Sequence, residues 1–395
     1  MPNNHFASMN IITKTDALAA FCIEAQKSPF VTVDTEFHRE TTYWPHLCLI
    51  QVAHDTDAAI IDPMADGIDL EPFFGLLSDP GTLKVFHAAR QDIEIFVKLT
   101  GEVPVSIFDT QMAASVCGYG DSVAYDKLVA AITGDTIDKS SRFTDWRRRP
   151  LSDKQLTYAL ADVTHLRDVY LTLEEQLQKN GRHHWLEADV DQLNEISTYL
   201  VAPEDAWKRL KVRLNRGIEL AALKELAAWR EAKAQNDDVP RGRILKDDAL
   251  IELAMQRPLS DQQFDRLRAV PKGFGRSPAG REVITILNEV NQRGKSELPK
   301  VERHKPGPSP KGAIGDLLRV LLKAVADKHG VAPRIIASSD DLNQLVLEDE
   351  ADIPALKGWR REIFGEKALA LKEGKLALAA TPKGVREIEI RSSDN

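Results

Sequence analysis

The chain has 395 residues, of which 43% are hydrophobic and 28% are charged. This length predicts about two or three domains, and the composition is that of a folded protein, which excludes a disordered chain. The three scattered cysteines are too few for a disulfide scaffold or a zinc cage and are typical of a reducing cytosol. We find neither an apolar run of about eighteen residues nor a secretory signal pattern, so we expect a cytoplasmic protein without a membrane span.

The net charge of −8 is unevenly distributed along the chain. Residues 1–200 hold 30 acidic and 16 basic residues, whereas residues 201–395 hold 30 acidic and 36 basic residues. This asymmetry favours an acidic catalytic unit joined to a basic binding unit. A solvated charged surface would give the same counts, so the asymmetry is supporting evidence only.

The first half of the chain alternates between strand and helix patterns. Runs rich in β-branched and aromatic residues predict strands at 30–37, 47–53, 58–62, 82–86 and 106–109, with helices at 15–26 and 89–99. The first three strands lie close together in sequence, so we expect them to pair in antiparallel fashion. The strand–helix alternation that follows predicts a mixed α/β sheet.

Helical patterns dominate from Ser152 onward. Ser152 and Gln155 form a capping-box pattern that opens a long helix, and we expect further helices at 207–216 and 219–234. Three prolines between residues 300 and 311 indicate a linker, and we expect the tail after Leu371 to fray.

A weak internal repeat connects two segments of this helical half. Residues 239–250 read VPRGRILKDDAL and residues 332–342 read APRIIASSDDL. In each, a Pro-led turn is followed by Ser or Asp residues that could cap an apolar helix. Two copies of one small helical bundle would explain this pattern, and coincidence is the alternative.

The strongest chemical signal is a set of spaced carboxylates. Asp34 and Glu36 are two residues apart on a predicted strand, so both side chains project from the same face. Two carboxylates on a buried face repel each other unless a cation neutralises them, and oxygen ligands suit Mg²⁺ or Mn²⁺. An exposed face with two solvated acids is the alternative for this pair taken alone.

Two further segments add an acid each. Asp92 follows the predicted strand at 82–86 and falls in the first turn of the next helix, where it could simply cap that helix. Tyr158 and Asp162 are four residues apart in the long helix, so a phenol and a carboxylate share one face. Together the segments contribute four acids and one tyrosine in a fixed order.

The three segments resemble the Exo I, Exo II and Exo III motifs of the DEDD 3′–5′ exonucleases. The matching residues are VDTEF at 33–37, HAARQDIEIF at 87–96 and YALADV at 158–163, and Tyr158 indicates the tyrosine-bearing subclass. Further segments are similar to the ribonuclease D group: YWPHLCLIQVA at 43–53, IFDTQMA at 107–113 and WRRRPLSDKQLTYALADV at 146–163. Residues 210–294 resemble the HRDC domain shared by ribonuclease D and RecQ helicases, and residues 313–380 resemble a second such module more weakly.

This resemblance implies an α/β plus all-α architecture: a ribonuclease H-like mixed-sheet exonuclease domain followed by two small helical HRDC-type bundles. The implied boundaries are 1–202 for the exonuclease domain, 210–294 for the HRDC domain, 295–312 for a linker and 313–380 for the second HRDC-like domain.

The resemblance also implies the activity, a 3′–5′ exoribonuclease that trims extra 3′ nucleotides from transfer RNA precursors and other small structured RNAs. Asp34, Glu36, Asp92 and Asp162 would hold two divalent ions, Mg²⁺ or Mn²⁺, and the products would be 5′-mononucleotides. A phenol with a pKa of about 10 is a poor base at neutral pH, so we expect Tyr158 to orient the attacking water, or to be deprotonated with help from the metal. RNA with a single-stranded 3′ end is the expected partner, and the chain is expected to be a monomer.

Substrate contacts are expected from three places in the sequence. Thr35 lies between the first two acids and would offer backbone groups near the terminal nucleotide. His87 and Gln91 flank the second motif and could contact sugar or phosphate. Arg142, Arg147, Arg148 and Arg149 cluster with Phe143 and Trp146 before the third motif. This cluster is either an RNA-binding loop, with Arg142 and Arg149 on phosphates and Trp146 on a base, or a surface arginine cluster with Trp146 in the core.

Two other functions compete with this interpretation. An RNA-binding protein with an inactive nuclease fold is disfavoured by the intact set of acids. A single-strand DNA 3′–5′ exonuclease is disfavoured only by the resemblance, because no single residue specifies RNA. The Walker A pattern does not occur in the sequence, which disfavours an ATP-driven helicase.

Overall fold

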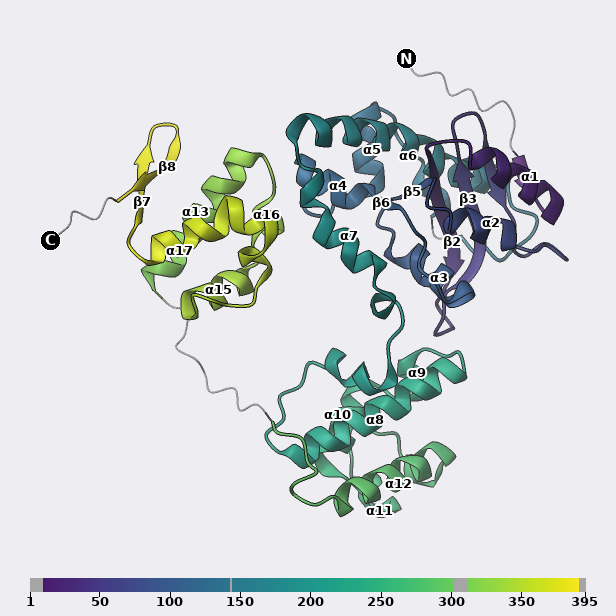
Figure 1. The fold of residues 1–395 in the computed structure, drawn as a ribbon. Coiled ribbons are helices and arrows are strands. Elements are labelled where there is room, and N and C mark those ends of the chain that lie inside the picture. The colour runs from purple at the N-terminus through teal and green to yellow at the C-terminus, as the bar shows by residue number, and fades with distance from the viewer. Residues whose placement is uncertain (1–9, 143, 302–311, 391–395) are drawn as a thin grey trace.

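The computed structural model describes residues 10–142, 144–301 and 312–390. Figure 1 shows a sheet unit (residues 10–200), a first helical unit (residues 203–292) and a second helical unit (residues 313–389). The described residues include no helix that is both long enough and apolar enough to cross a membrane.

A six-stranded mixed sheet forms the centre of the sheet unit, with the strand order β1-β4-β3-β2-β5-β6. The strands are β1 (Asn10–Ile12), β2 (Phe30–His38), β3 (His46–Ala53), β4 (Ala58–Ile61), β5 (Leu83–Phe86) and β6 (Ile107–Asp109). β2, β3 and β4 are antiparallel neighbours, whereas β5 and β6 are added parallel to β2. The predicted antiparallel pairing and the mixed sheet are therefore confirmed.

Helices cover both faces of this sheet. α1 (Thr15–Ala25), α2 (Glu71–Leu77) and α3 (Arg90–Thr100) bury one face, and α6 (Asp153–Asn180) packs against the other. The predicted capping box is present at the start of α6, where Ser152 and Gln155 exchange hydrogen bonds. The remaining helices of this unit are α4 (Thr110–Cys117), α5 (Tyr125–Thr133), η1 (Lys139–Ser141), η2 (His183–Trp185), α7 (Glu187–Asn194) and η3 (Ile196–Thr198).

The first helical unit is built around α8 (Gly217–Asn236). Its other helices are η4 (Pro203–Arg209), α9 (Arg241–Ile244), α10 (Asp247–Gln256), α11 (Asp261–Phe264), η5 (Phe274–Arg276) and α12 (Pro278–Gln292). The helix predicted at 207–216 is wrong, because the 3₁₀ helix η4 ends at Arg209 and no helix resumes until Gly217. The predicted linker lies mostly outside the described residues.

The second helical unit ends in a β-hairpin. Its helices are α13 (Ala313–His329), α14 (Pro333–Ile336), α15 (Ser339–Leu347), η6 (Pro354–Leu356), α16 (Gly358–Arg360), the π-helical turn η7 (Arg361–Gly365) and α17 (Glu366–Lys372). β7 (Leu376–Thr381) and β8 (Gly384–Glu389) then pair in antiparallel fashion. The expectation that the tail frays after Leu371 is therefore wrong, because main-chain pairing and the buried Leu376 order it.

The two repeat segments have the same local structure. In each, a one-turn helix after proline, α9 or α14, precedes a longer helix, α10 or α15. Only the second copy has the predicted side-chain cap, from Ser338 to the backbone of Asp341. At the corresponding position of the first copy stands Lys246, which makes no capping bond.

Both helical units contact the sheet unit through specific side chains. Tyr43, in the loop after β2, donates a hydrogen bond to the buried carboxylate of Glu231 in α8 and accepts one from Arg241 at 2.8 Å. Trp185 of the sheet unit stacks on Trp359 of the second helical unit, with ring centroids 4.1 Å apart. The second helical unit and the sheet unit thus share one hydrophobic core.

Candidate active site

Strand β2 supplies the first two carboxylates. Its pairing with β3 is regular from Thr32 to Glu36, and the register shifts only after Glu36. Asp34 and Glu36 therefore project from one face, as predicted, and this is the face that α6 covers. The Thr32 hydroxyl fixes that helix on the strand by donating a hydrogen bond of 2.8 Å to the carbonyl of Val163.

Helix α6 supplies the third carboxylate and the tyrosine. Asp162 is 7% exposed, and a hydrogen bond connects it to Tyr158 one helical turn earlier. The Tyr158 ring lies beside the buried ring of Trp146, with centroids 6.1 Å apart. This packing fixes the direction of the phenol toward the acids.

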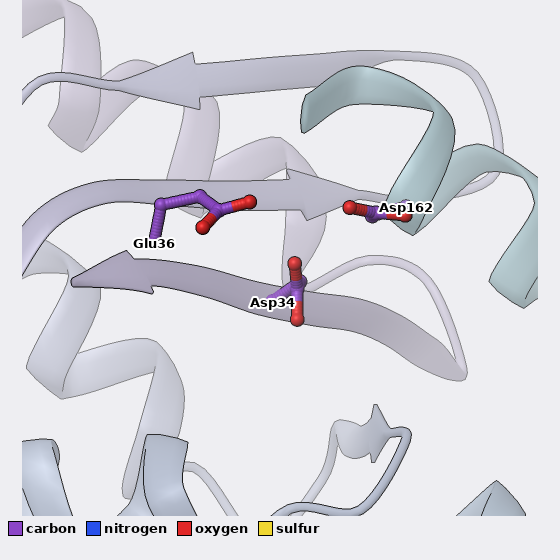
Figure 2. Close-up of side chains that lie close together, drawn as sticks. All are labelled: Asp34, Glu36 and Asp162. Atoms are coloured by element: carbon purple, nitrogen blue, oxygen red, sulfur yellow. The ribbon is translucent and has the colours of Figure 1, made fainter. Parts of the chain in front are cut away.

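Three of the four predicted acids converge. Asp34, Glu36 and Asp162 each offer a carboxylate oxygen, and these oxygens lie within 4.8 Å of one another. Figure 2 shows the two side chains of β2 and the one from α6 turned toward a common centre. A separation of this size suits joint coordination of a cation by oxygen ligands.

Asp92 adjoins this group through Thr35. It lies in the first turn of α3, is 7% exposed and accepts a hydrogen bond from the Thr35 hydroxyl. The segment before it is fixed by Asp109, whose carboxylate accepts hydrogen bonds from the main-chain N–H groups of Ala88 at 3.1 Å and Ala89 at 2.8 Å. Thr35 therefore positions Asp92 with its side chain, a contact that the sequence did not reveal.

Burial and mutual repulsion make the acids hard to ionise together. Burial and the charge of Asp162 raise the pKa of Asp34, and burial and the charge of Asp34 raise the pKa of Asp92. Burial and the neighbouring acids raise the pKa of Glu36 to about 10. Burial raises the pKa of Asp162 to about 7, although the hydrogen bond with Tyr158 and nearby Arg142 oppose this shift.

This donor set fits divalent metal ions. Charged oxygens gathered in a buried place are costly without a positive partner, and hard cations such as Mg²⁺ and Mn²⁺ prefer such oxygens. The acidic cluster of Asp34, Glu36 and Asp162 is therefore consistent with metal binding.

A cleft of about 510 Å³ opens in front of the acids. Three of the six predicted substrate residues, Thr35, His87 and Arg142, contribute to its lining. Gln91 is exposed at the start of α3 but does not line the cleft.

The arginine cluster is only partly available for substrate. Arg149 forms an ion pair with Asp62 at 2.6 Å and donates a hydrogen bond of 2.8 Å to the carbonyl of Cys48. Trp146 is 3% exposed and packs with Leu49 and Leu156, so its place is the core, not an open surface. Phe143 lies outside the described residues.

Tyr125 is a cleft residue that the sequence did not indicate. Its hydroxyl donates a hydrogen bond of 2.7 Å to the main-chain carbonyl of Asp162, and burial raises its pKa. Ser122 and Lys139 also line the cleft. These residues come from the region around α5, which carries no motif, so only the tertiary structure brings them to the acids.

The raised pKa of Asp162 gives a testable pH dependence in the metal-free protein. Between the unfolded pKa near 4 and the folded pKa of about 7, the folded state binds a proton that the unfolded chain has released. The contribution of Asp162 to the free energy of unfolding therefore falls as the pH rises through this window.

Asp162→Asn removes this titration. The free energy of unfolding of the variant, minus that of the unmodified chain, should therefore increase by roughly 1–3 kcal/mol between pH 4 and pH 7. Thermal unfolding in the presence of a chelator, at several pH values for both proteins, measures the difference. An equal difference at every pH would contradict the pKa shift.

Comparisons with known proteins identify the family. Residues 9–178 match a 3′–5′ exonuclease model, and residues 219–287 match the HRDC domain model. Ribonuclease D of Nitrobacter hamburgensis is 49% identical over 382 residues, which cover 96% of this chain and 100% of the relative. Ribonuclease D of Gluconacetobacter diazotrophicus is 46% identical over 378 residues, which cover 96% of each chain.

A solved structure shows the same architecture. The crystal structure of Escherichia coli RNase D, described as an exoribonuclease involved in structured RNA processing, matches with a TM-score of 0.80 and 29% identity. The match covers 92% of this chain and 99% of the E. coli chain. Together with the two relatives and with the acids gathered in the cleft, this match shows that the chain belongs to the ribonuclease D family of hydrolytic 3′–5′ exoribonucleases.

Proposed function

We propose that this exoribonuclease trims extra 3′ nucleotides from transfer RNA precursors and other small structured RNAs, and releases 5′-mononucleotides. The observation that carries the proposal is the convergence of Asp34, Glu36 and Asp162 within 4.8 Å at the cleft. The description of the E. coli relative as a processor of structured RNA supports the substrate class.

In the proposed mechanism, Asp34, Glu36, Asp92 and Asp162 would hold two divalent ions. When bound, such ions neutralise the carboxylates and stabilise the charge that develops on the reacting phosphate. Tyr158 orients the attacking water through its hydroxyl, and it stays protonated because burial and the nearby acids raise its pKa. Arg142, which lines the cleft, would neutralise a substrate phosphate.

The basic first helical unit would bind the body of the RNA outside the cleft. Arg243, Lys246, Arg266 and Arg268 are exposed there and offer contacts to phosphates. The domain boundaries, the cytoplasmic location and the monomeric state given above stay predictions.

Product analysis tests the function directly. The full chain is incubated with a 3′-extended transfer RNA and with single-stranded DNA of matched length, with Mg²⁺, with Mn²⁺ and with a chelator. We expect stepwise shortening of the RNA from its 3′ end and release of 5′-mononucleotides only with a divalent ion. Faster digestion of the DNA would favour the alternative of a DNA exonuclease, and no digestion would favour an inactive RNA-binding protein.

His87 is our candidate for contact with the ribose. The Thr110 hydroxyl donates its one hydrogen to the Phe86 carbonyl at 2.9 Å, so its oxygen accepts from His87 Nδ1 at 3.0 Å. That assignment leaves Nε2 as an acceptor, which is buried and has no partner of good hydrogen-bond geometry among the described residues, so contact with a ribose requires the ring to turn toward the cleft. The carbonyl of Val123 lies near the ring and also accepts a hydrogen bond of 3.1 Å from Gln111.

His87→Phe keeps a ring of similar size but removes this acceptor. We expect kcat/KM on RNA to fall about 3- to 10-fold, the value of one hydrogen bond, and to fall less on DNA, which lacks the 2′-hydroxyl. Steady-state kinetics on RNA and DNA of one sequence measure the ratio, with Gln91→Ala as the control outside the cleft. Equal losses on both substrates would contradict a contact with the 2′-hydroxyl.

A further inference from the structure

Gln51 is a polar side chain sealed inside the sheet unit. It lies in the middle of β3 and is 0% exposed. Neither its Oε1 nor its Nε2 has a hydrogen-bond partner among the described residues. Because buried amides are almost always hydrogen-bonded, this side chain requires an explanation.

The sheet register places Gln51 beside the acids. It is directly opposite Asp34 on β2 and opposite Ile60 on β4, and opposed residues project from the same face. Leu49 and Ala53, two residues away on either side, pack against α6. Gln51 therefore lies beneath α6, in the layer that also contains the acids.

Most of the described neighbours of Gln51 on this face offer no acceptor to its amide. Ile60, Leu49 and Ala53 are apolar, and the Thr32 hydroxyl is already bonded to the Val163 carbonyl. Opposed side chains have Cβ atoms about 4.5–5.5 Å apart, a distance that the arm of a glutamine spans easily. The carboxylate of Asp34, directly opposite, is thus the acceptor best placed for the amide of Gln51, and Glu36 is its diagonal neighbour on the same face.

We propose that Gln51 is a positioning residue, whose amide donates a hydrogen bond to Asp34 when that carboxylate holds a divalent cation. This inference rests on the proposed function of the acids as metal ligands. A carboxylate that gives one oxygen to a metal leaves the other free to accept a hydrogen bond, and such outer partners fix the ligand's direction. A neutral amide donates this bond without competing with the cation for the carboxylate. A positively charged lysine at this position would compete.

Gln51→Met tests the proposal, because methionine has a similar volume and no donor. The loss of an outer partner typically weakens metal binding about 10- to 100-fold. We therefore expect the dissociation constant of Mn²⁺, measured on the full chain by calorimetry or electron paramagnetic resonance without RNA, to rise by that factor. The metal-free variant should unfold at the same or a higher temperature than the unmodified chain, because it no longer buries an unpaired amide.

Leu49→Met is the matched control, since it changes packing on the same strand and face without removing a polar group. It should leave the dissociation constant of Mn²⁺ unchanged. If Gln51→Met lowers the unfolding temperature and leaves Mn²⁺ binding unchanged, Gln51 has only a structural role and the proposal is overturned. If the unmodified chain itself binds no Mn²⁺, the failure lies with the proposed function instead.

A measurement on the unmodified chain keeps the test independent of how the variant folds. With ¹⁵N-labelled glutamine, the side-chain amide signal of Gln51 should shift when Mg²⁺ is added, because the amide gains its acceptor. An Mg²⁺ titration that leaves every glutamine side-chain signal in place would also overturn the proposal.

Discussion

Asp34→Asn should reduce the metal-dependent release of mononucleotides at least about a hundredfold while the chain stays folded. Asp34 lies with Glu36 and Asp162 in the converged group, so a cation held there would be shared by all three acids. An amide of the same shape offers a neutral oxygen where a charged one is required. The loss should therefore appear in turnover and in Mn²⁺ affinity together.

The same substitution should stabilise the metal-free protein. Burial and the charge of Asp162 raise the pKa of Asp34, which shows that its ionised form is unfavourable in the fold. Replacing it with asparagine removes this repulsion, so the unfolding temperature in the presence of a chelator should rise. Loss of activity with gain of stability is the signature of a functional acid.

Chromatographic measurement of released mononucleotides and thermal unfolding with and without Mg²⁺ check both parts. Asp66→Asn, the same chemical change on an exposed loop, is the control and should alter neither quantity. Retained Mg²⁺-dependent activity in Asp34→Asn would count against the assignment of this acid as a metal ligand.

The sequence predicted the parts of the site that follow from local periodicity. Side chains alternate along a strand, so Asp34 and Glu36 had to share a face, and the helical repeat put Tyr158 and Asp162 together. The apolar residues of β2 also predicted a buried strand, and the capping box predicted where α6 begins. The motif segments fall on the predicted elements because each carries its own local signal.

Long-range contacts could not be predicted in this way. The ion pair of Arg149 with Asp62 joins residues 87 positions apart, and no local pattern shows that this arginine is already engaged. The burial of Trp146 likewise depends on the packing of α6 against β3. Three of the six predicted substrate residues, Gln91, Trp146 and Arg149, therefore lie outside the cleft. Their positions depend on tertiary contacts that no local sequence pattern indicates.

The C-terminal hairpin has a different cause. An Ala-, Lys- and Glu-rich tail favours helix or disorder by propensity, but strand pairing depends on context more than helix formation does. β7 and β8 are ordered by pairing with each other and by packing on the helices of the second helical unit, where Leu376 is buried. A propensity argument for an isolated segment misses such stabilisation.

Tyr158→Phe should lower kcat by about 10²–10³-fold and change RNA affinity by less than about twofold. Burial and the charges of Asp162, Glu36 and Asp34 raise the pKa of Tyr158, so the phenol keeps its proton throughout the neutral range. We therefore expect it to act by holding a hydrogen bond in place, not by accepting a proton. Phenylalanine removes the hydroxyl but keeps the ring that lies against Trp146.

Single-turnover rates and equilibrium binding of a 3′-extended RNA separate the two effects. Tyr170→Phe, which removes a hydroxyl from the same helix where the ring packs on Phe30 and Phe108, is the matched control and should leave kcat unchanged. Because the phenol stays protonated, the profiles of kcat against pH for Tyr158→Phe and the unmodified chain should run parallel between about pH 6 and 9. A fall in RNA affinity as large as the fall in kcat would show instead that Tyr158 holds the substrate before the reaction begins.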